Sequence, residues 1–368
     1  MKAEMKNKSI VACLIVLIVV ILLAIVLFAI YEYSDLLRCH HTFSSRNGVT
    51  ATCVIEGITP ERYCTKCGYT YTTGGHSDRR NGYLSVDKCT AHDKHEFALK
   101  VNEEDTNTCT ITGLGPDFEG TEIVIPAEYM GKKVTCIGKN AFYENDTQRV
   151  TSISFENAEN LVCIEEGAFR SANFIEEADF SHCLNLKTIY DGAFESCESL
   201  TQVILPDSLL TIGDNAFYGC KNLRTVIFND ESQLKTIGSR SFMGCKLTAI
   251  KIPDSVTTIS FEAFARCENL QEVIFGENSQ LNEICRAAFM YCKKLISITI
   301  PKSVKMINYE AFLHCTELSS VVFADINNWG IQSPISVAVL PIDVSDAEIN
   351  ASNLLGEYCN ARWVKYED

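Results

Sequence analysis

The amino-acid sequence predicts an α/β repeat solenoid that carries a parallel sheet on one face. A phenylalanine, a cysteine and a leucine recur at fixed offsets through the C-terminal two thirds of the chain, as in Phe194, Cys197 and Leu200. An isoleucine stands five residues before each of these phenylalanines, as Ile189 does before Phe194. Eight such units follow one another at periods of roughly 22 to 27 residues, which is the range of stacked-coil proteins.

Each unit reads as one turn of a coil. Leu200, Val203 and Leu205 are apolar, and the last two have the alternate spacing of a short strand with one buried side. A single coil leaves its apolar edge uncovered, so the units must stack and share one continuous core. We expect the recurring cysteines to be buried free thiols. Neighbouring strands lie about 4.8 Å apart, and parallel side chains at that spacing do not readily meet the geometry of a disulfide.

The repeat also resembles a known family. The segment from Leu200 to Cys220 reads Leu-x-x-Val-x-Leu-Pro-x-Ser-Leu-x-x-Ile-Gly-x-x-Ala-Phe-x-x-Cys, which is similar to the BspA-type leucine-rich repeat of bacterial and protist surface proteins. The resemblance runs from about Thr108 to Phe323, and its first part looks like the N-terminal repeat of that family. It implies a leucine-rich repeat solenoid with a surface-binding role, and we assign residues 97–323 to the repeats.

Residues 10–31 form an uncharged and almost wholly apolar stretch. At about 1.5 Å per residue it is long enough for a helix to cross a hydrocarbon core of roughly 30 Å. Three lysines precede this stretch and two acidic residues follow it closely, so the positive-inside rule places residues 1–9 in the cytoplasm. We therefore expect an uncleaved, single-pass transmembrane anchor with the repeats outside, on the cell surface.

A small module rich in cysteine and histidine, residues 36–96, separates the anchor from the repeats. Its Cys-x-x-Cys-Gly turn is typical of a zinc knuckle, in which two thiolates bind one side of a tetrahedral ion. The module also resembles small Cys/His modules found beside such repeats in bacterial surface proteins. We predict one structural zinc; the alternative is a set of disulfides that staple a small extracellular domain. The predicted ligands are Cys53, Cys64 and Cys67, with the fourth drawn from Cys39, His41 or His76.

Composition and motifs exclude several classes of function. The net charge of -15 argues against nucleic acid or an anionic membrane as the partner, because both attract basic surfaces. The chain has no Gly-x-x-x-x-Gly-Lys loop, no Gly-x-Ser-x-Gly elbow and no His-Glu-x-x-His helix. We therefore expect neither catalysis nor a small-molecule substrate.

The outward positions of the predicted strands are the candidate binding surface. Aliphatic side chains edged by polar groups are typical of a protein-binding face. The competing interpretation is that β-branched residues favour strands whether or not anything binds them. The candidate residues form one column of Ile204, Ile227, Lys251, Ile274 and Thr299 and a neighbouring column that includes Gln202, Thr225 and Glu272.

The sequence therefore indicates a membrane-anchored surface protein that binds protein or glycan, or mediates adhesion, through this face. The alternatives are a structural envelope component without a soluble ligand and a zinc- or redox-responsive surface protein. Residues 324–368 are expected to form a C-terminal cap. In this cap, a capping box at Ser345 to Glu348 starts a helix that runs through Tyr358, and Trp329 and Trp363 cover the last coil.

Overall fold

The computed structural model describes residues 96–115, 118–143, 150–335 and 338–366 in full, together with the backbone of six short strands before residue 86. These six are β1 (Thr42–Ser44), β2 (Thr50–Thr52), β3 (Tyr63–Cys64), β4 (Thr70–Thr72), β5 (Gly75–Ser77) and β6 (Leu84–Ser85). β1 to β5 form one sheet in the order β2-β1-β3-β4-β5, and their pairings are antiparallel. The chain divides into two compact units, residues 1–80 with 87–91 and residues 81–86 with 92–368.

The predicted membrane span at residues 10–31 lies outside the described residues. Within the part of the chain that the structure describes, no helix is long and apolar enough to cross a membrane.

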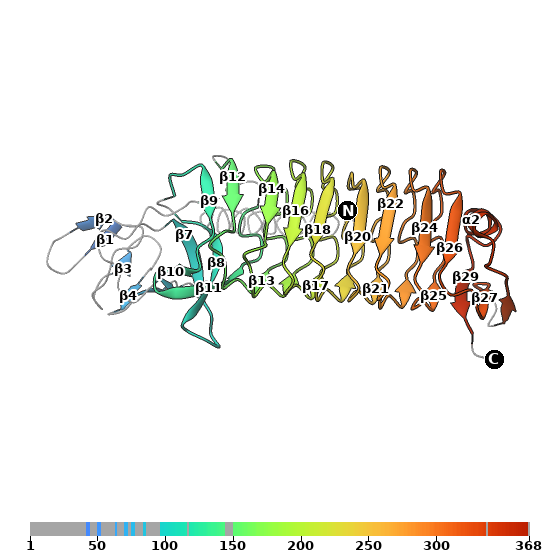
Figure 1. Cartoon of the computed structure of the whole chain (residues 1–368). Helices are drawn as coiled ribbons and strands as arrows, with labels where there is room; N and C mark the ends of the chain where they lie inside the picture. Colours follow the sequence, from blue (N-terminus) through green and yellow to red (C-terminus); the bar gives the residue numbers. More distant parts are fainter. Residues whose placement is uncertain are drawn as a thin grey trace, which may run out of the picture. The chain divides into compact units, whose positions relative to one another are not determined.

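The second unit is a solenoid with two columns of parallel strands (Figure 1). The first column comprises β9 (Glu122–Val124), β12 (Ser152–Ser154), β14 (Glu177–Asp179), β16 (Gln202–Leu205), β18 (Thr225–Phe228), β20 (Ala249–Ile252), β22 (Glu272–Phe275), β24 (Ser297–Ile300) and β26 (Ser320–Phe323). These strands hydrogen-bond in groups of two or three. We call their solvent-facing side the long-strand face.

A second column, which we call the short-strand sheet, is continuous along the stack. Its coil strands are β13 (Cys163–Ile164), β15 (Thr188–Ile189), β17 (Thr211–Ile212), β19 (Thr236–Ile237), β21 (Thr258–Ile259), β23 (Glu283–Ile284) and β25 (Met306–Ile307). Each isoleucine in these strands is the one that stands five residues before a core phenylalanine, and each is fully buried. The parallel strands predicted on one face are present as the long-strand column, and the short-strand sheet is a second set of parallel strands that the sequence reasoning did not predict.

The predicted α/β class is wrong, and the fold is a β-solenoid. Among the residues that the structure describes, the only helix follows the last coil. The segments around the core phenylalanines form tight bends, because the residues two before and two after each phenylalanine mostly have positive φ. Around Phe264, for example, Glu262 has a φ of 54° and Arg266 a φ of 59°. A backbone that alternates in this way cannot continue as a right-handed helix.

Antiparallel strands cover the N-terminal end of the stack. β7 (Phe97–Val101) pairs with β8 (Thr108–Leu114), which in turn runs parallel to β11 (Lys132–Ile137). The short strand β10 (Glu128–Tyr129) pairs with β11. These strands extend the short-strand sheet beyond the first coil.

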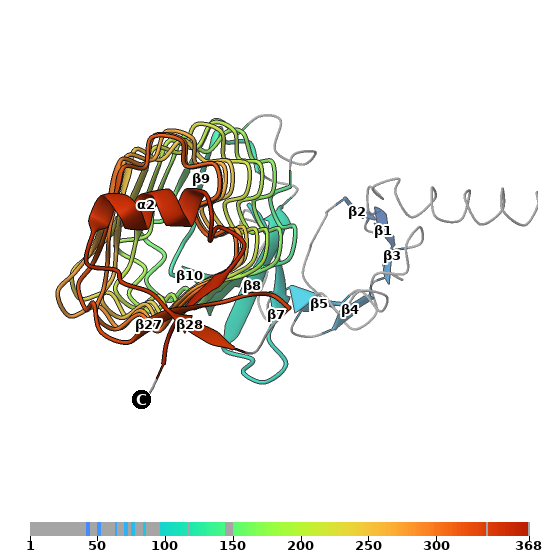
Figure 2. The ribbon, with the colours of Figure 1, turned by 90° about the vertical axis from the view of Figure 1, so that its right-hand side faces the viewer.

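The C-terminal end has β27 (Trp329–Gln332), β28 (Val339–Pro341), α2 (Ala347–Leu355) and β29 (Arg362–Lys365). Figure 2 looks along the stack and shows the coils nearly superimposed, with α2 across the end. The Trp363 ring lies 5.9 Å from that of Phe323, which belongs to the last long strand. The predicted helix boundaries are corrected: Asp346 rather than Ser345 is the N-cap, its carboxylate accepting from two backbone N–H groups, and Gly356 ends the helix before Tyr358.

The core is a stack of phenylalanine rings. Neighbouring ring centroids lie 5.0 to 5.5 Å apart, and the ring planes are within 2° to 14° of parallel. All eight rings are buried. The stack comprises Phe142, Phe169, Phe194, Phe217, Phe242, Phe264, Phe289 and Phe312.

The recurring cysteines lie beside this stack as buried free thiols, as the sequence predicts. Each thiol donates to the backbone carbonyl of the phenylalanine in the preceding coil, as Cys220 Sγ does to Phe194 O at 3.1 Å. The same carbonyl accepts the backbone N–H of Cys197 in its own coil at 3.3 Å. A small side chain with one weak donor fits this site because the carbonyl still has a free lone pair.

The strand spacing does not by itself prevent a disulfide between coils, so that part of the sequence argument is wrong. Cys136 in β11 and Cys163 in β13 are direct neighbours in the short-strand sheet and form a disulfide across a Cα–Cα distance of 4.8 Å. The buried thiols instead donate to backbone carbonyls, as described above.

We predict that Ser241→Ala stabilises the protein. Ser241 stands where other coils have alanine, and its fully buried hydroxyl has no hydrogen-bond partner. An unsatisfied buried polar group costs about 1–3 kcal/mol, so removing it should raise the free energy of unfolding by about 1 kcal/mol in urea denaturation. Ser208→Ala is the control and should destabilise, because the Ser208 hydroxyl donates to Leu186 O at 2.8 Å. A lower unfolding free energy for Ser241→Ala would contradict the assignment.

The buried thiols should also resist alkylation in the native protein. Burial excludes the reagent and raises the pKa of the Cys267 thiol to about 12, so the reactive thiolate is scarce. Iodoacetamide labelling at pH 8 followed by peptide mapping should modify half-buried Cys359 before Cys267, which should react only after unfolding. Equal labelling rates at Cys267 and Cys359 would show that the cysteine column is open to solvent.

Candidate functional site

The eight candidate binding residues all lie on the long-strand face, and none of them is buried. Strand register aligns them in columns, since Ile204 pairs with Ile227 between β16 and β18 and Lys251 pairs with Ile274 between β20 and β22. In the neighbouring column Gln202 pairs with Thr225, while Glu272 is the register partner of Ala249. Thr299 continues the first column in β24 and is the register partner of Val322 in β26.

Several aliphatic side chains of this face are exposed to solvent. Ile227 is 37% exposed, Ile274 39% and Val322 44%. Val124 in β9 is 40% exposed on the same face and is the register partner of Ser154 in β12. The sequence reasoning missed Val124, because its coil lacks the phenylalanine and cysteine that mark the other units. The strand-like string Ile123-Val-Ile-Pro could have located it.

One charged side chain interrupts the aliphatic column. Lys251 lies in β20, between the strands that carry Ile227 and Ile274 (Figure 1). Its ammonium group lies 2.5 Å from the Asp230 carboxylate, and this hydrogen bond raises the pKa of Lys251 and lowers the pKa of Asp230. Both side chains are well exposed, so the pair orients Lys251 rather than burying its charge.

The N-terminal part of the long-strand face is more acidic. Glu177 and Asp179 both point outward from β14, and Asp179 is the register partner of Ile204 in β16. Glu122 is exposed in β9 at the start of the same face. The face therefore carries three acidic side chains at its N-terminal end, whereas toward its C-terminal end Lys251 and Glu272 accompany the exposed aliphatic residues.

The predicted zinc ligands are only partly covered by the structure. Cys64 lies in β3 and His76 in β5, and β4 pairs with both of these strands. The side chains of these two residues lie outside the described residues. So do the other four candidates, which are Cys39, His41, Cys53 and Cys67.

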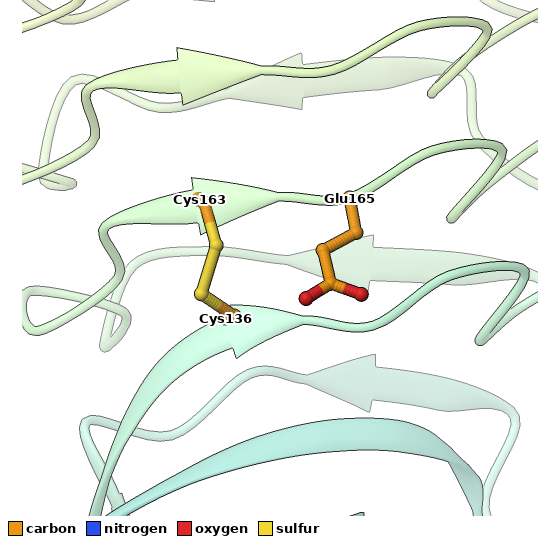
Figure 3. A group of neighbouring side chains, drawn as sticks. All are labelled: Cys136, Cys163 and Glu165. Atoms are coloured by element: carbon orange, nitrogen blue, oxygen red, sulfur yellow. A yellow bond between two sulfur atoms is a disulfide. The ribbon is translucent and has the colours of Figure 1, made fainter. Parts of the chain in front are cut away.

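A different group of potential metal ligands lies on the short-strand sheet. The sulfurs of Cys136 and Cys163 and a carboxylate oxygen of Glu165 all lie within 4.8 Å of one another (Figure 3). The sequence reasoning missed this group. The available signal was the Cys-Ile dipeptide that ends β11 and forms β13, at positions where the next four coils have Thr-Ile.

Comparison with known proteins identifies the repeat. The model of the BspA type leucine rich repeat region matches residues 120–234 and 235–333, in six copies. No curated protein matches the chain.

Among solved structures, the leucine rich repeat protein of T. pallidum is 21% identical, with 63% of this chain and 91% of that chain covered and a TM-score of 0.39. A leucine rich cell surface protein from Faecalibacterium prausnitzii is also 21% identical, with 66% and 96% covered and a TM-score of 0.24. The pneumococcal vaccine antigen PcpA is 18% identical, with 64% and 82% covered and a TM-score of 0.32.

These TM-scores lie below 0.5, so the assignment rests on the repeat sequence, which the family model matches over more than half of the chain. Leucine-rich repeat proteins typically serve as non-enzymatic binding scaffolds, and the family suggests a protein-binding or adhesion role. The chain belongs to the BspA-type leucine-rich repeat family.

Proposed function

We propose that this protein is a cell-surface binding protein whose long-strand face engages an extracellular protein or glycan. The observation that carries the proposal is the column of solvent-exposed aliphatic side chains on that face, in particular Ile227, Ile274 and Val322. Their neighbours in the adjoining column are Thr225, Glu272 and Ser320, so polar groups border the aliphatic positions. Apolar contacts surrounded by polar groups are the usual composition of a protein interface.

The stack makes this face suitable for binding because it holds the side chains in fixed register. Ile204 and Ile227 are aligned by the hydrogen bonds between β16 and β18, and Lys251 and Ile274 by those between β20 and β22. The backbone of this face is already ordered before a partner binds, so less binding free energy is lost to conformational entropy.

The proposed location rests on the sequence. The apolar stretch at residues 10–31, with lysines before it and acidic residues after it, supports a single-pass anchor with the repeats outside the cell. The Cys-x-x-Cys-Gly spacing of residues 64–68 supports a structural zinc in the module between anchor and repeats. In this proposal that module is a spacer, and the solenoid performs the binding.

The binding face can be tested by replacing its exposed aliphatic residues. The full-length protein in detergent is first screened against arrays of extracellular proteins and of glycans, and the affinity for each hit is then measured by surface plasmon resonance. The double change Ile227→Glu and Ile274→Glu should weaken binding by at least about tenfold, because charges at the centre of an interface must be desolvated.

The matched control is Val162→Glu. Val162 is similarly exposed, at 40%, but directly precedes β13 in the short-strand sheet. This change should leave the affinity unaltered. Binding that survives the double change, or that is lost equally in the control, would overturn the proposed face.

A further inference from the structure

The disulfide at the start of the short-strand sheet differs from the column of buried thiols beside the phenylalanine stack. Cys136 and Cys163 are half-buried, are bonded to each other, and lie on adjacent strands in direct register. The next four residues of the same column are threonines, namely Thr188, Thr211, Thr236 and Thr258. The column then continues with Glu283 and Met306, so the two sulfurs occupy positions that other coils fill with different side chains and are not required by the core.

Glu165 lies beside this sulfur pair. It is two residues after Cys163, so both side chains project from the same side of the strand, and the Glu165 carboxylate points toward the strand that carries Cys136 (Figure 3). The backbone N–H of Lys139 donates to Glu165 Oε2 at 2.8 Å, which orients the carboxylate. The corresponding positions of the next two coils are Tyr190 and Gly213, and neither side chain carries a carboxylate.

We propose that Cys136, Cys163 and Glu165 form a redox-gated site for a thiophilic divalent cation, with Zn²⁺ as the representative ion. In the oxidised protein the disulfide staples the first two coils and offers no thiolate. In the reduced protein the two sulfurs and the carboxylate supply three ligands, and water completes a tetrahedral site. Cysteine thiolates and carboxylate oxygens are both established zinc ligands.

The spacing of the strands fits this ligand set. Zinc–sulfur bonds of about 2.3 Å in a tetrahedral site put the two sulfurs roughly 3.8 Å apart. The Cα atoms of Cys136 and Cys163 are 4.8 Å apart. Side-chain rotation can therefore bring the sulfurs to the required separation while the backbone of the sheet stays in place. The Lys139 N–H acts as the outer hydrogen-bond donor that typically orients a ligating carboxylate.

Opening the site requires a two-electron reduction of the disulfide. The disulfide takes up two electrons and two protons from a dithiol reductant, which leaves as its own disulfide, and the protein gains two thiols. Zn²⁺ then binds both sulfurs as thiolates, and their two protons pass to solvent. Bound zinc protects the thiols from reoxidation, so the ion and the disulfide compete for the same two sulfurs.

The test compares the full-length protein with the double variant Cys136→Thr and Cys163→Thr, which restores the residue of the following coils. Each protein is reduced with dithiothreitol under nitrogen, freed of reductant by gel filtration and equilibrated with zinc sulfate. Unbound metal is then removed, and zinc per chain is measured by mass spectrometry. The reduced wild type should hold about one more zinc ion per chain than the reduced variant, whereas the two oxidised proteins should hold equal amounts.

Zinc bound by residues 36–96 is common to both proteins and cancels in the difference, so this result is independent of the module. Equal zinc content in the two reduced proteins would overturn the proposal. Glu165→Gln provides the second variant, because it keeps both thiols and the disulfide. It should lower the zinc affinity of the reduced protein by at least about tenfold in competition with a chromophoric chelator, as loss of metal-site groups usually does. An unchanged zinc affinity in this variant would show that Glu165 is not a ligand.

Discussion

Every coil of this solenoid is attached to the next at the bend that carries the core phenylalanine. Between the coils of Phe217 and Phe242 the rings stack at 5.3 Å, and the backbone N–H of Phe217 donates to Ser241 O at 2.8 Å. The Cys245 thiol then donates back to Phe217 O at 3.3 Å. Three contacts of different kinds thus act between the same two bends, and because they recur along the stack they set the register of both strand columns.

This fixed register separates the residues that define the fold from those that are free to vary. Inward positions such as Val203 and Ile212 must fill the space between coils and are fully buried. Outward positions have no such constraint, and they range from Asp179 through Ile227 to Lys251 along the long-strand face. A repeat protein of this kind can therefore vary its outward side chains without changing its core.

The sequence predicted the repeat, its buried phenylalanines and cysteines, and the outward columns, because all of these recur at fixed offsets. The second sheet escaped prediction because its strands are only two residues long, as in Thr211–Ile212, and so show no alternating pattern. The predicted helical content was wrong because positive-φ residues around each phenylalanine close the bend within a few residues. The pair Cys136–Cys163 was missed because it joins residues 27 positions apart, outside the cysteine column, and becomes visible only in register.

Amide hydrogen exchange of the core bends tests most directly whether they hold the stack together. The N–H groups of Phe217, Phe242 and Phe264 each donate to the following coil, so they should exchange only through unfolding of the stack and rank among the most protected amides. The exposed loop residue Ile335 provides the fast reference. Protection of the phenylalanine amides no greater than that of Ile335, with the strands β16 and β18 still protected, would show that the stack is held elsewhere.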